Sequence, residues 1–507
     1  RYANTHTESS GTGLQTSRLR EDARAIIHGA VNGTEADVVI FTGSGATGAI
    51  DRLVGILGIR IPSELEDRYQ LSTQIPVAER PVIFIGPFEH HSNELPWRES
   101  IADVVAIPQD ADGHIDLVHL ERELIRHVAR PLMIGAFSAA SNVTGILSDT
   151  TAISSLLHRH GALSFWDCAA AGPYVELSMR AEAGHPESYK DAMFLSPHKF
   201  IGGPSTPGVL VVRRELLRNR VPDVPGGGTV QYVNPADHVY LSDPVAREEG
   251  GTPAIIEAIR AGLVFDLKQA VGVDVIRAHE ARFLSRAIEA WAAEPAIEVL
   301  GNLAAERLSI VSFVVRRPAG RYLHHNFVVT LLNDLFGIQS RGGCSCAGPY
   351  GHRLLGIDLD HSLQFERQIA VGCEGIKPGW VRVNFNYFLS DVVVDYVIAA
   401  VLFVARHGHL FLRDYRFDPT TALWHHRTGV IDPLLRLDQL SYAADGTLVY
   451  PRHRDRAPET ELAHYLRQAE ALAASYERVE DDLDAHVSAD FDALRWFELP
   501  AGCVGHR

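Results

Sequence analysis

The sequence predicts an α/β protein whose first part holds a mostly parallel sheet covered by helices on both faces. Two observations lead to this fold class. From Leu14 to Pro222, stretches with helical spacing of apolar residues alternate with short apolar strands. The strands are apolar on both faces, which is typical of parallel sheets that are covered on both sides. In such sheets, functional side chains gather in the loops beyond the carboxyl ends of the strands.

The expected strands are short and apolar. They cover Asp37–Thr42, Pro81–Gly86, Asp103–Ile107, Leu132–Phe137, Ala162–Asp167, a segment that ends at Phe194, and Gly208–Val212. Helical spacing is present over Leu14–Asn32, Thr47–Leu57, Leu117–Val128 and Asp149–His160. Because helices separate most of these strands, we expect neighbouring strands to run parallel.

The pattern changes after glycine-rich turns at Gly226–Gly228 and Gly250–Pro253. A helix-rich stretch follows from Ile255 to about Trp291, and a smaller α/β unit is expected from Ile297 to about Arg406. Farther on, a helical pattern runs from Glu459 to about Asp484. The predicted division is a large domain over residues 1–270, a small α/β domain over 271–406, and a C-terminal extension of unknown role over 407–507.

The composition is that of a folded protein without a nucleic-acid partner. A net charge of −16 with no basic stripe argues against nucleic acid or an anionic membrane surface as a main partner. The longest apolar stretch, Val392–Ala405, is expected to be a buried or amphipathic helix that is too short to span a bilayer. Five cysteines, an odd number, do not form a disulfide framework, so we expect a reducing, cytoplasmic setting.

Lys199 is prominent because the chain contains only four lysines. It lies within Ser196–Gly203 (SPHKFIGG), directly after the apolar run Ala192–Leu195. A lysine amine forms a Schiff base with an aldehyde cofactor when burial or a neighbouring cation lowers its pKa. The alternative is a surface lysine on a loop, which is where most lysines lie. The remaining motifs have to decide between the two.

Two further motifs follow predicted strands. Thr42–Gly48 (TGSGATG) offers backbone N–H groups and a helix N-terminus to a phosphate, and Thr47 adds a hydroxyl. Such turns are also common without ligands, and the spacing fits neither a dinucleotide-binding nor a Walker motif. Phe88–Trp97 (FEHHSNELPW) contains two adjacent histidines. One of these rings would stack on a planar cofactor, or else cap a helix or fill the core.

Two polar residues end the next strands. Asp167 would hold a proton on the nitrogen of a pyridine ring and make that ring an electron sink, or it caps the following helix. Asn142 would bond to a hydroxyl on the same ring.

The second unit holds candidate residues for the substrate. Cys344 and Cys346 lie on a glycine-rich loop that begins near Arg341, and a nearby cation favours the nucleophilic thiolate. A metal site would need further ligands at zinc spacing, and the sequence shows none. Plain loop cysteines are the remaining alternative. Arg382 is a lone cation in an apolar strand, where it would pair with a substrate carboxylate or with a carboxylate of the protein.

Taken together and in this order, these segments resemble the class V aminotransferases, a family of pyridoxal-phosphate enzymes of fold type I. The likeness is greatest to the cysteine desulfurase and selenocysteine lyase branch, and it covers about residues 1 to 405. It implies pyridoxal 5'-phosphate as cofactor, an amino acid as substrate, a sulfur acceptor as a further partner, and a homodimer.

The resemblance also implies roles for the matching residues. Lys199 would form the Schiff base, His90 would stack on the ring and take part in catalysis, and Cys346 would accept the sulfur. The other expected cofactor-binding residues are Ala46, Thr47, Asn142, Asp167, Ser196, His198 and, serving the partner subunit's cofactor, Thr252. The expected substrate-binding residues are Arg382, Arg341, His6 and Asn93.

The chain departs from the family pattern in three places. Ala170 stands where the family has a glutamine that bonds to the ring oxygen. Tyr2–His6 resembles a motif that lies farther inside family members, so we expect the first strand and helix of the usual fold to be missing. The tail beyond Arg406 has no counterpart.

The expected function is removal of sulfur from an amino acid through a persulfide on Cys346. An aminotransferase, epimerase or C–S lyase without a thiol nucleophile remains open, as does a non-catalytic scaffold on the same fold. Cys346 is expected to be the reactive thiol rather than Cys344, because only Cys346 keeps the family's spacing from Arg341 and its following alanine.

Overall fold

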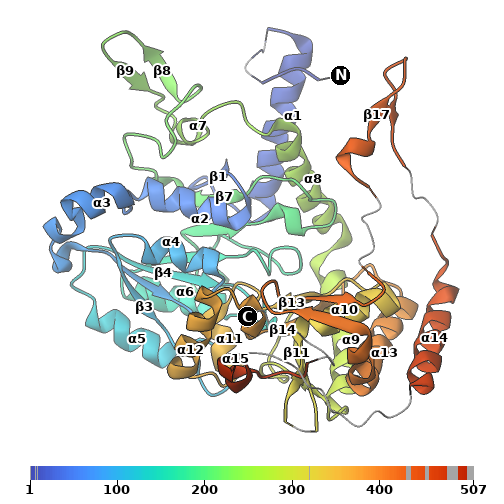
Figure 1. The fold of residues 1–507 in the computed structure, drawn as a ribbon. Coiled ribbons are helices and arrows are strands. Elements are labelled where there is room, and N and C mark those ends of the chain that lie inside the picture. The colour runs from blue at the N-terminus through green and yellow to red at the C-terminus, as the bar shows by residue number, and fades with distance from the viewer. Residues whose placement is uncertain are drawn as a thin grey trace. The chain divides into compact units, whose positions relative to one another are not determined.

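The computed structural model describes residues 2–5, 7, 9–318, 320–429, 435–451, 456–476 and 489–499, and the chain forms two compact units (Figure 1). Unit 1 comprises Arg1–Arg282, Gly301–Ile310 and Cys346–Tyr350, and unit 2 comprises Phe283–Leu300, Val311–Ser345 and Gly351–Arg507. The chain therefore crosses between the units several times, and the short segment that starts at Cys346 returns to unit 1.

Unit 1 is built around a seven-stranded sheet with the order β1-β7-β6-β5-β4-β2-β3. The strands are β1 (Asp37–Phe41), β2 (Val82–Ile85), β3 (Asp103–Ala106), β4 (Met133–Ser138), β5 (Leu163–Asp167), β6 (Ala192–Leu195) and β7 (Val209–Arg213). Strands β6, β5, β4, β2 and β3 pair in parallel, whereas β7 is antiparallel to both β6 and β1. Every strand except β7 therefore ends at the same edge of the sheet. The predicted mostly parallel sheet is confirmed.

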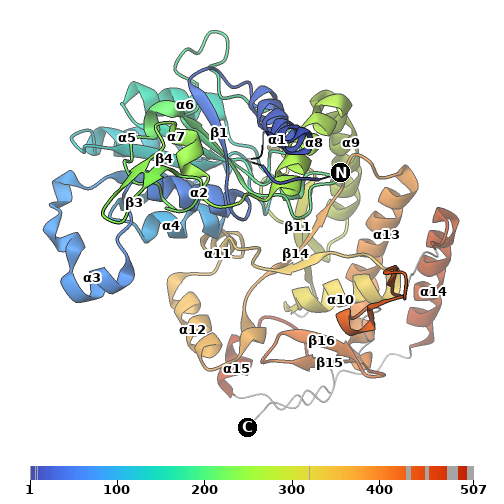
Figure 2. The same cartoon turned by 90° about the horizontal axis from the view of Figure 1, so that it is seen from above.

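Helices cover this sheet on both faces. They are α1 (Gly11–Ala30), α2 (Gly45–Ile56), α4 (Leu95–Arg98), α5 (Leu117–Arg126), α6 (Thr150–Arg159), α7 (Pro244–Glu248) and α8 (Ile255–Val271). A further short helix of this unit, α3 (Ser63–Tyr69), has no buried residue. On one face, Ile50 and Leu53 of α2 pack on alternate strand residues such as Ile83 and Phe165, as the two-residue period of a strand requires. Helices α1 and α8 lie side by side (Figures 1 and 2).

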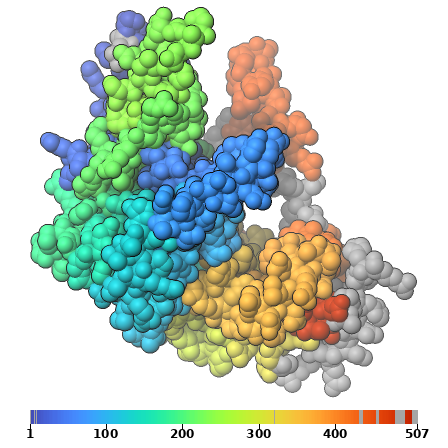
Figure 3. All heavy atoms as spheres, turned by 90° about the vertical axis from the view of Figure 1, so that its left-hand side faces the viewer, coloured from blue at the N-terminus to red at the C-terminus, as the bar shows by residue number. Residues whose placement is uncertain are grey.

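The loop between β7 and α8 carries a hairpin of β8 (Val230–Val233) and β9 (His238–Tyr240), which projects from unit 1 (Figures 1 and 3). Its side chains include exposed apolar groups: Tyr232 is 65% exposed and Val239 is 54% exposed. This hairpin is not among the elements expected from the sequence.

Unit 2 contains a smaller sheet with the order β10-β11-β14-β13, and β12 pairs with β11. Its strands are β10 (Ile297–Val299), β11 (Ile310–Arg316), β12 (Tyr322–Leu323), β13 (Arg341–Gly343) and β14 (Trp380–Asn384), and its helices are α10 (His325–Phe336), α12 (Leu359–Ala370) and α13 (Asp391–His407). Two more helices, α9 (Val273–Ala292) and α11 (Gly348–Leu354), begin in unit 1 and end in unit 2.

The tail is part of the core of unit 2. Its described elements are β15 (Tyr415–Asp418), β16 (Leu423–His426), β17 (Ser441–Tyr442), β18 (Leu448–Val449), α14 (Leu462–Ser475) and α15 (Ala489–Leu494). Phe417, Trp424 and Phe497 are buried in one cluster with Phe327 of α10 and Val401 of α13. The tail therefore completes the hydrophobic core of this unit. The helix expected from Glu459 to about Asp484 begins at Leu462 and already ends at Ser475, because Tyr476 has an extended backbone. Asp484 itself lies outside the described residues.

Helix α13 corresponds to the apolar stretch of the sequence. With the 3₁₀ turn that follows it, this helical segment, Asp391–Asp414, is long and apolar enough to cross a membrane by length and composition alone. The expectation that it is too short was wrong, because the helix continues beyond the apolar run. Half of its most apolar window is buried, and Val394, Val401 and Val404 lie in the core of unit 2. The segment has the packing of a core helix.

Candidate active site

The turns that follow β1 and β6 meet at the carboxyl edge of the sheet in unit 1. The N–H group of Ala46 donates a hydrogen bond of 2.9 Å to Ser196 Oγ, which is buried. Gly45 has a φ of +56°, and a Cβ atom there would lie 2.5 Å from Cε1 of His198 and 2.8 Å from Ser196 Oγ. Only glycine fits this position. The two motifs expected to bind a phosphate therefore form one cradle.

A second contact joins the α2 turn to the histidine motif. Thr47 Oγ1 lies 2.6 Å from Ser92 Oγ, which is 3.1 Å from His90 Nδ1. The backbone N–H of Ser92 also donates to His90 Nδ1 at 3.1 Å. Because Nδ1 accepts this bond, the neutral imidazole carries its proton on Nε2. The orientation of the His90 ring is therefore fixed by Ser92 in the same loop.

Lys199 and Asp167 lie at the ends of neighbouring strands. Lys199 ends a 3₁₀ turn after β6 and is exposed, whereas Asp167 ends β5 and is buried. Burial raises the pKa of the Asp167 carboxyl above its ordinary value, while the N–H of Ala169 and the charge of Lys199 oppose the shift. The predicted lysine and the predicted ring-binding acid are thus close enough to interact electrostatically.

Lys199 is exposed, but two other lysines of unit 1 are buried. Lys190 and Lys268 are buried, and burial lowers the pKa of each to about 8. Their ammonium groups donate to backbone carbonyl oxygens, Lys190 Nζ to Ser188 at 2.6 Å and Lys268 Nζ to Gly172 at 2.7 Å. These two lysines therefore fasten loops of unit 1, and their amines are engaged.

Glu89 is a residue of this edge that the sequence analysis passed over. Its carboxylate accepts hydrogen bonds from the N–H groups of Gly86 (3.1 Å) and Ser138 (3.0 Å) and from Ser138 Oγ (2.5 Å). Burial raises its pKa to about 7, although the bonds from Ser138 and Asn93 act in the opposite direction. Glu89 therefore ties the end of β2 to the end of β4. The one signal in the sequence was an acid directly beside the histidine pair.

Asn93, expected to bind substrate, is fully buried in the same network. Its amide nitrogen donates to Glu89 Oε2 at 2.7 Å and to the carbonyl of Ala136 at 3.2 Å, and its oxygen accepts from the indole of Trp97 at 3.2 Å. This geometry gives Asn93 a part in holding the histidine motif on the sheet, and contact with substrate stays a prediction.

Three other predicted residues occupy different settings. Asn142 is half-buried in the turn after β4, where Ser141 Oγ accepts from the N–H groups of Val143 and Thr144. Thr252 is exposed in the turn before α8. His6 lies outside the described residues.

The two predicted substrate arginines lie side by side on adjacent strands in unit 2. Arg341 on β13 and Arg382 on β14 are directly paired in an antiparallel register. Both line a cavity of about 600 Å³ together with Asn384, Tyr396 and Leu462. Two arginines that line one cavity suit a carboxylate. Leu462 comes from the tail, so the tail forms part of the cavity wall.

The two thiols of the glycine-rich loop belong to different units, Cys344 to unit 2 and Cys346 to unit 1. Cys344 and Cys346 are both half-buried, and neither forms a disulfide. Ser345 and Cys346 adopt left-handed backbone angles, with φ of +53° and +57°. The carbonyl of Cys346 accepts a 2.8 Å hydrogen bond from the N–H of His91, which places Cys346 beside the histidine motif in unit 1.

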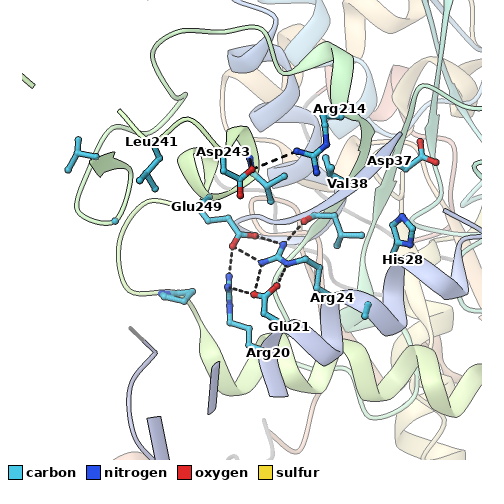
Figure 4. A pocket seen from close by; sticks show the side chains of 17 residues that line it. Arg20, Glu21, Arg24, His28, Asp37, Val38, Arg214, Leu241, Asp243 and Glu249 are labelled. Carbon is cyan, nitrogen blue, oxygen red and sulfur yellow. Dashed lines mark hydrogen bonds and ion pairs between the residues drawn. The ribbon is translucent and has the colours of Figure 1, made fainter. Parts of the chain in front are cut away.

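Another cavity lies elsewhere in unit 1 (Figure 4). It has a volume of about 940 Å³ and is lined by α1, the edge strand β1, α7 and the hairpin segment. In it, Glu249 pairs with Arg20 and Arg24. None of the predicted cofactor-binding residues lines this cavity. Across the described ranges of the chain, no group of three histidine, cysteine or acidic residues could hold a metal ion.

A family model described as aminotransferase class-V matches residues 1–364. Among curated proteins, a probable cysteine desulfurase of Halalkalibacterium halodurans is 28% identical over 333 residues, which are 65% of this chain and 73% of that protein. A probable cysteine desulfurase of Halobacterium salinarum is 28% identical over 323 residues, 63% of this chain and 68% of that protein.

Solved structures give the same fold. The apo cysteine desulfurase of Thermococcus onnurineus NA1 matches with a TM-score of 0.63 and 23% identity over 80% of this chain and 88% of that one. The cysteine desulfurase CsdA of Escherichia coli matches with a TM-score of 0.59 and 22% identity over 79% of this chain and 86% of that one. These similarities confirm the predicted fold class.

Proposed function

The chain belongs to the class-V aminotransferase family of pyridoxal-phosphate-dependent enzymes, and within it we propose that this protein removes sulfur from an amino acid of the cysteine type. The observation that carries the proposal is the meeting of the phosphate cradle, the histidine motif and the Cys346 segment at one edge of the sheet in unit 1. The names of the similar proteins support the same chemistry.

The residues present at this edge fit pyridoxal 5'-phosphate. The Gly45–Ala46 turn, Ser196 and Thr47 offer donors to a phosphate at the start of α2, where the helix dipole favours an anion. His198 is half-buried beside them, and burial together with the charge of Lys199 lowers its pKa, so it binds as a neutral hydrogen-bonding group. When bound, the cofactor supplies an electron sink for the bonds of the substrate's α-carbon.

The side chains around the cradle divide the remaining tasks. Lys199 provides the amine that holds the cofactor and moves the proton at the substrate's α-carbon. Asp167 would hold a proton on the ring nitrogen. The His90 ring, fixed through Nδ1, would stack on the cofactor with its proton on Nε2. Asn142 would bond to the ring hydroxyl.

Cys346 carries the sulfur step. Its thiolate sulfur forms a bond to the sulfur of the substrate while the substrate's carbon–sulfur bond breaks, and the electron pair stays with the substrate carbon. Protonation of that carbon releases alanine, and Cys346 keeps the sulfur as a persulfide for an acceptor. Arg341 and Arg382 hold the substrate carboxylate.

A homodimer is part of the proposal. Ile256, Leu263 and Leu267 of α8 are 48%, 58% and 42% exposed, and they follow the Thr252 turn directly. The exposed apolar side chains of the β8–β9 hairpin lie in the same unit. Exposed aliphatic groups grouped on one helix are typical of a surface that a partner covers. We place Thr252 at the partner subunit's phosphate, and the enzyme in the cytoplasm.

The test uses the full chain loaded with pyridoxal phosphate and a panel of amino acids. Lys199→Ala should abolish the adduct that borohydride traps, whereas the control Lys377→Ala, on another lysine, should keep it. With cysteine and an added dithiol reductant, which reduces the persulfide and releases its outer sulfur as sulfide, alanine and sulfide should form in the parent and in Cys344→Ser but not in Cys346→Ser. If Cys346→Ser makes alanine at the parent rate, or keto-acid products dominate, the chemistry is that of a transaminase or C–S lyase.

A further inference from the structure

The segment Cys346–Tyr350 is attached to unit 1 by His91 through two hydrogen bonds. The backbone N–H of His91 donates to the carbonyl oxygen of Cys346 at 2.8 Å. In return, the backbone N–H of Gly348 donates to Nε2 of the His91 ring at 3.1 Å. His91 thus bonds to the backbone of both Cys346 and Gly348. We call this pair of hydrogen bonds the clasp.

A second attachment follows at the end of the same segment. Tyr350 is buried, its hydroxyl lies 3.1 Å from Thr144 Oγ1, and its ring packs against Phe88 with a centroid distance of 5.7 Å. Phe88 belongs to the loop after β2 that carries His90, and Thr144 to the turn after β4 that carries Asn142. The segment is therefore held by the same two loops that present the proposed cofactor ligands.

The backbone before the clasp is strained. Ser345 and Cys346 are consecutive non-glycine residues in the left-handed region, with φ of +53° and +57°. A side chain in that region costs free energy, so such residues persist only where surrounding contacts determine the conformation. The contacts to Cys346 and Gly348 from His91 are of that kind, and the first of them is made at a strained residue.

We propose that His91 is a positioning residue that holds the Cys346 thiol in its reactive place by clasping Cys346–Gly348 against unit 1. The proposal rests on the proposed sulfur chemistry for its consequence, and on the two hydrogen bonds for its geometry. His91 itself touches neither substrate nor cofactor in this assignment. It acts through the backbone on both sides of Ala347.

The hydrogen bond from the Gly348 N–H to His91 Nε2 determines which substitutions of His91 preserve the clasp. Nε2 accepts from Gly348, so the neutral His91 ring carries its proton on Nδ1. The amide oxygen of glutamine reaches about as far from the backbone as Nε2 and also accepts. Asparagine is one carbon shorter, and leucine cannot accept a hydrogen bond. The backbone N–H of residue 91 remains in all three variants, so the series isolates the ring bond.

The experiment measures the clasp and the chemistry separately in the loaded full chain. The resting enzyme is treated with iodoacetamide, and the alkylation rate of each cysteine is followed by peptide mass spectrometry, with Cys373 as internal control. Alanine release from cysteine, with kcat and KM resolved, is measured on the same samples. Circular dichroism and thermal melting confirm that each variant is folded, and His91→Asn is the second variant if His91→Leu does not fold.

In His91→Leu and His91→Asn, we expect Cys346 to be alkylated about tenfold faster and kcat for alanine to fall by about tenfold, the size expected when one hydrogen bond to a backbone N–H is lost. KM for cysteine and alkylation of Cys373 should not change, and His91→Gln should stay near the parent in both measurements. An unchanged Cys346 alkylation rate in His91→Leu, or a His91→Gln variant as impaired as leucine, would overturn the proposal. Should the parent release no alanine, the sulfur chemistry fails, while the alkylation series still decides the clasp.

Discussion

Replacing Glu249 with glutamine should destabilise unit 1 strongly, because this carboxylate holds two arginines at the edge of the sheet (Figure 4). Glu249 Oε2 lies 2.6 Å from Arg20 Nη2 and 2.9 Å from Arg24 Nη2. Its other oxygen accepts the N–H of Phe41 at 2.8 Å. Arg24 also donates to the carbonyl of Val39. The cluster therefore satisfies backbone groups on the open side of β1, which is an edge strand.

The magnitude follows from burial. The side chains of Glu249 and Arg20 are each 10% exposed, and that of Arg24 is 17% exposed. Removing one partner of a buried ion pair costs about 3–5 kcal/mol, because the remaining charge has lost its counterion. Since glutamine keeps part of the hydrogen bonding, we expect about 3 kcal/mol, at the lower end of that range. Unit 1 has about 300 residues, and at roughly 2.1 cal/mol/K of unfolding entropy per residue that loss lowers Tm by roughly 5 °C.

The assay is thermal unfolding of the full chain at neutral pH, compared with Glu35→Gln. Glu35 is exposed just before β1, so this control makes the same charge change without breaking the cluster. A Tm for Glu249→Gln within a degree of the control would refute the reasoning.

The pH dependence gives an independent check. Burial alone would raise the pKa of Glu249, but the charges of Arg24 and Arg20 lower it below its ordinary value. The contribution of this carboxylate to the free energy of unfolding is therefore fully present above its pKa in the unfolded chain, about 4.3. It is lost as the pH falls through the lower pKa of the folded state. The difference in Tm between parent and Glu249→Gln should shrink in acid and be constant near neutrality.

Two further predictions concern unit 2. Burial lowers the pKa of His325 to about 3 and that of His324 well below its ordinary value, so both rings are neutral in the folded unit. In the unfolded chain, each histidine takes up a proton below a pKa near 6.5. The free energy of unfolding is therefore highest above that pH and falls in acid by up to about 1.4 kcal/mol per pH unit for each histidine. Denaturant unfolding between pH 7 and 5 should show this fall in the free energy of unfolding, and the fall should be smaller in His325→Leu. An equal fall in parent and variant would contradict the prediction. Trp424→Ala should cost about 3–5 kcal/mol, because its ring is buried and its indole N–H donates to His324 Nδ1 at 3.1 Å; a loss below about 1 kcal/mol in the same assay would show that the tail does not support this core.

The sequence predicted the sheet of unit 1 well because its strands are apolar on both faces, a local property that needs no knowledge of distant contacts. The same holds for the order of strand-end motifs that includes Asp167 and Lys199. What the sequence could not give depends on contacts between distant segments. The clasp between His91 and Gly348, the burial of Lys190, and the carboxylate of Glu89 between two strand ends have no periodic signal. The tail was left without a role because no motif marks Trp424 as a core residue.

The contacts of the C-terminal tail determine when unit 2 can finish folding during translation. The N–H of Tyr322 in β12 donates to the carbonyl of Trp496 at 3.1 Å, and the carbonyl of Tyr322 accepts from the N–H of Glu498 at 3.0 Å. Phe497, between these two residues, is fully buried. The ribosome makes β12 long before it makes this partner. Until then, the apolar surface that Phe497 covers stays open. Unit 2 therefore cannot complete its folding during translation of its own sheet, and a nascent chain paused after α13 is a natural client for chaperones that bind exposed apolar surface.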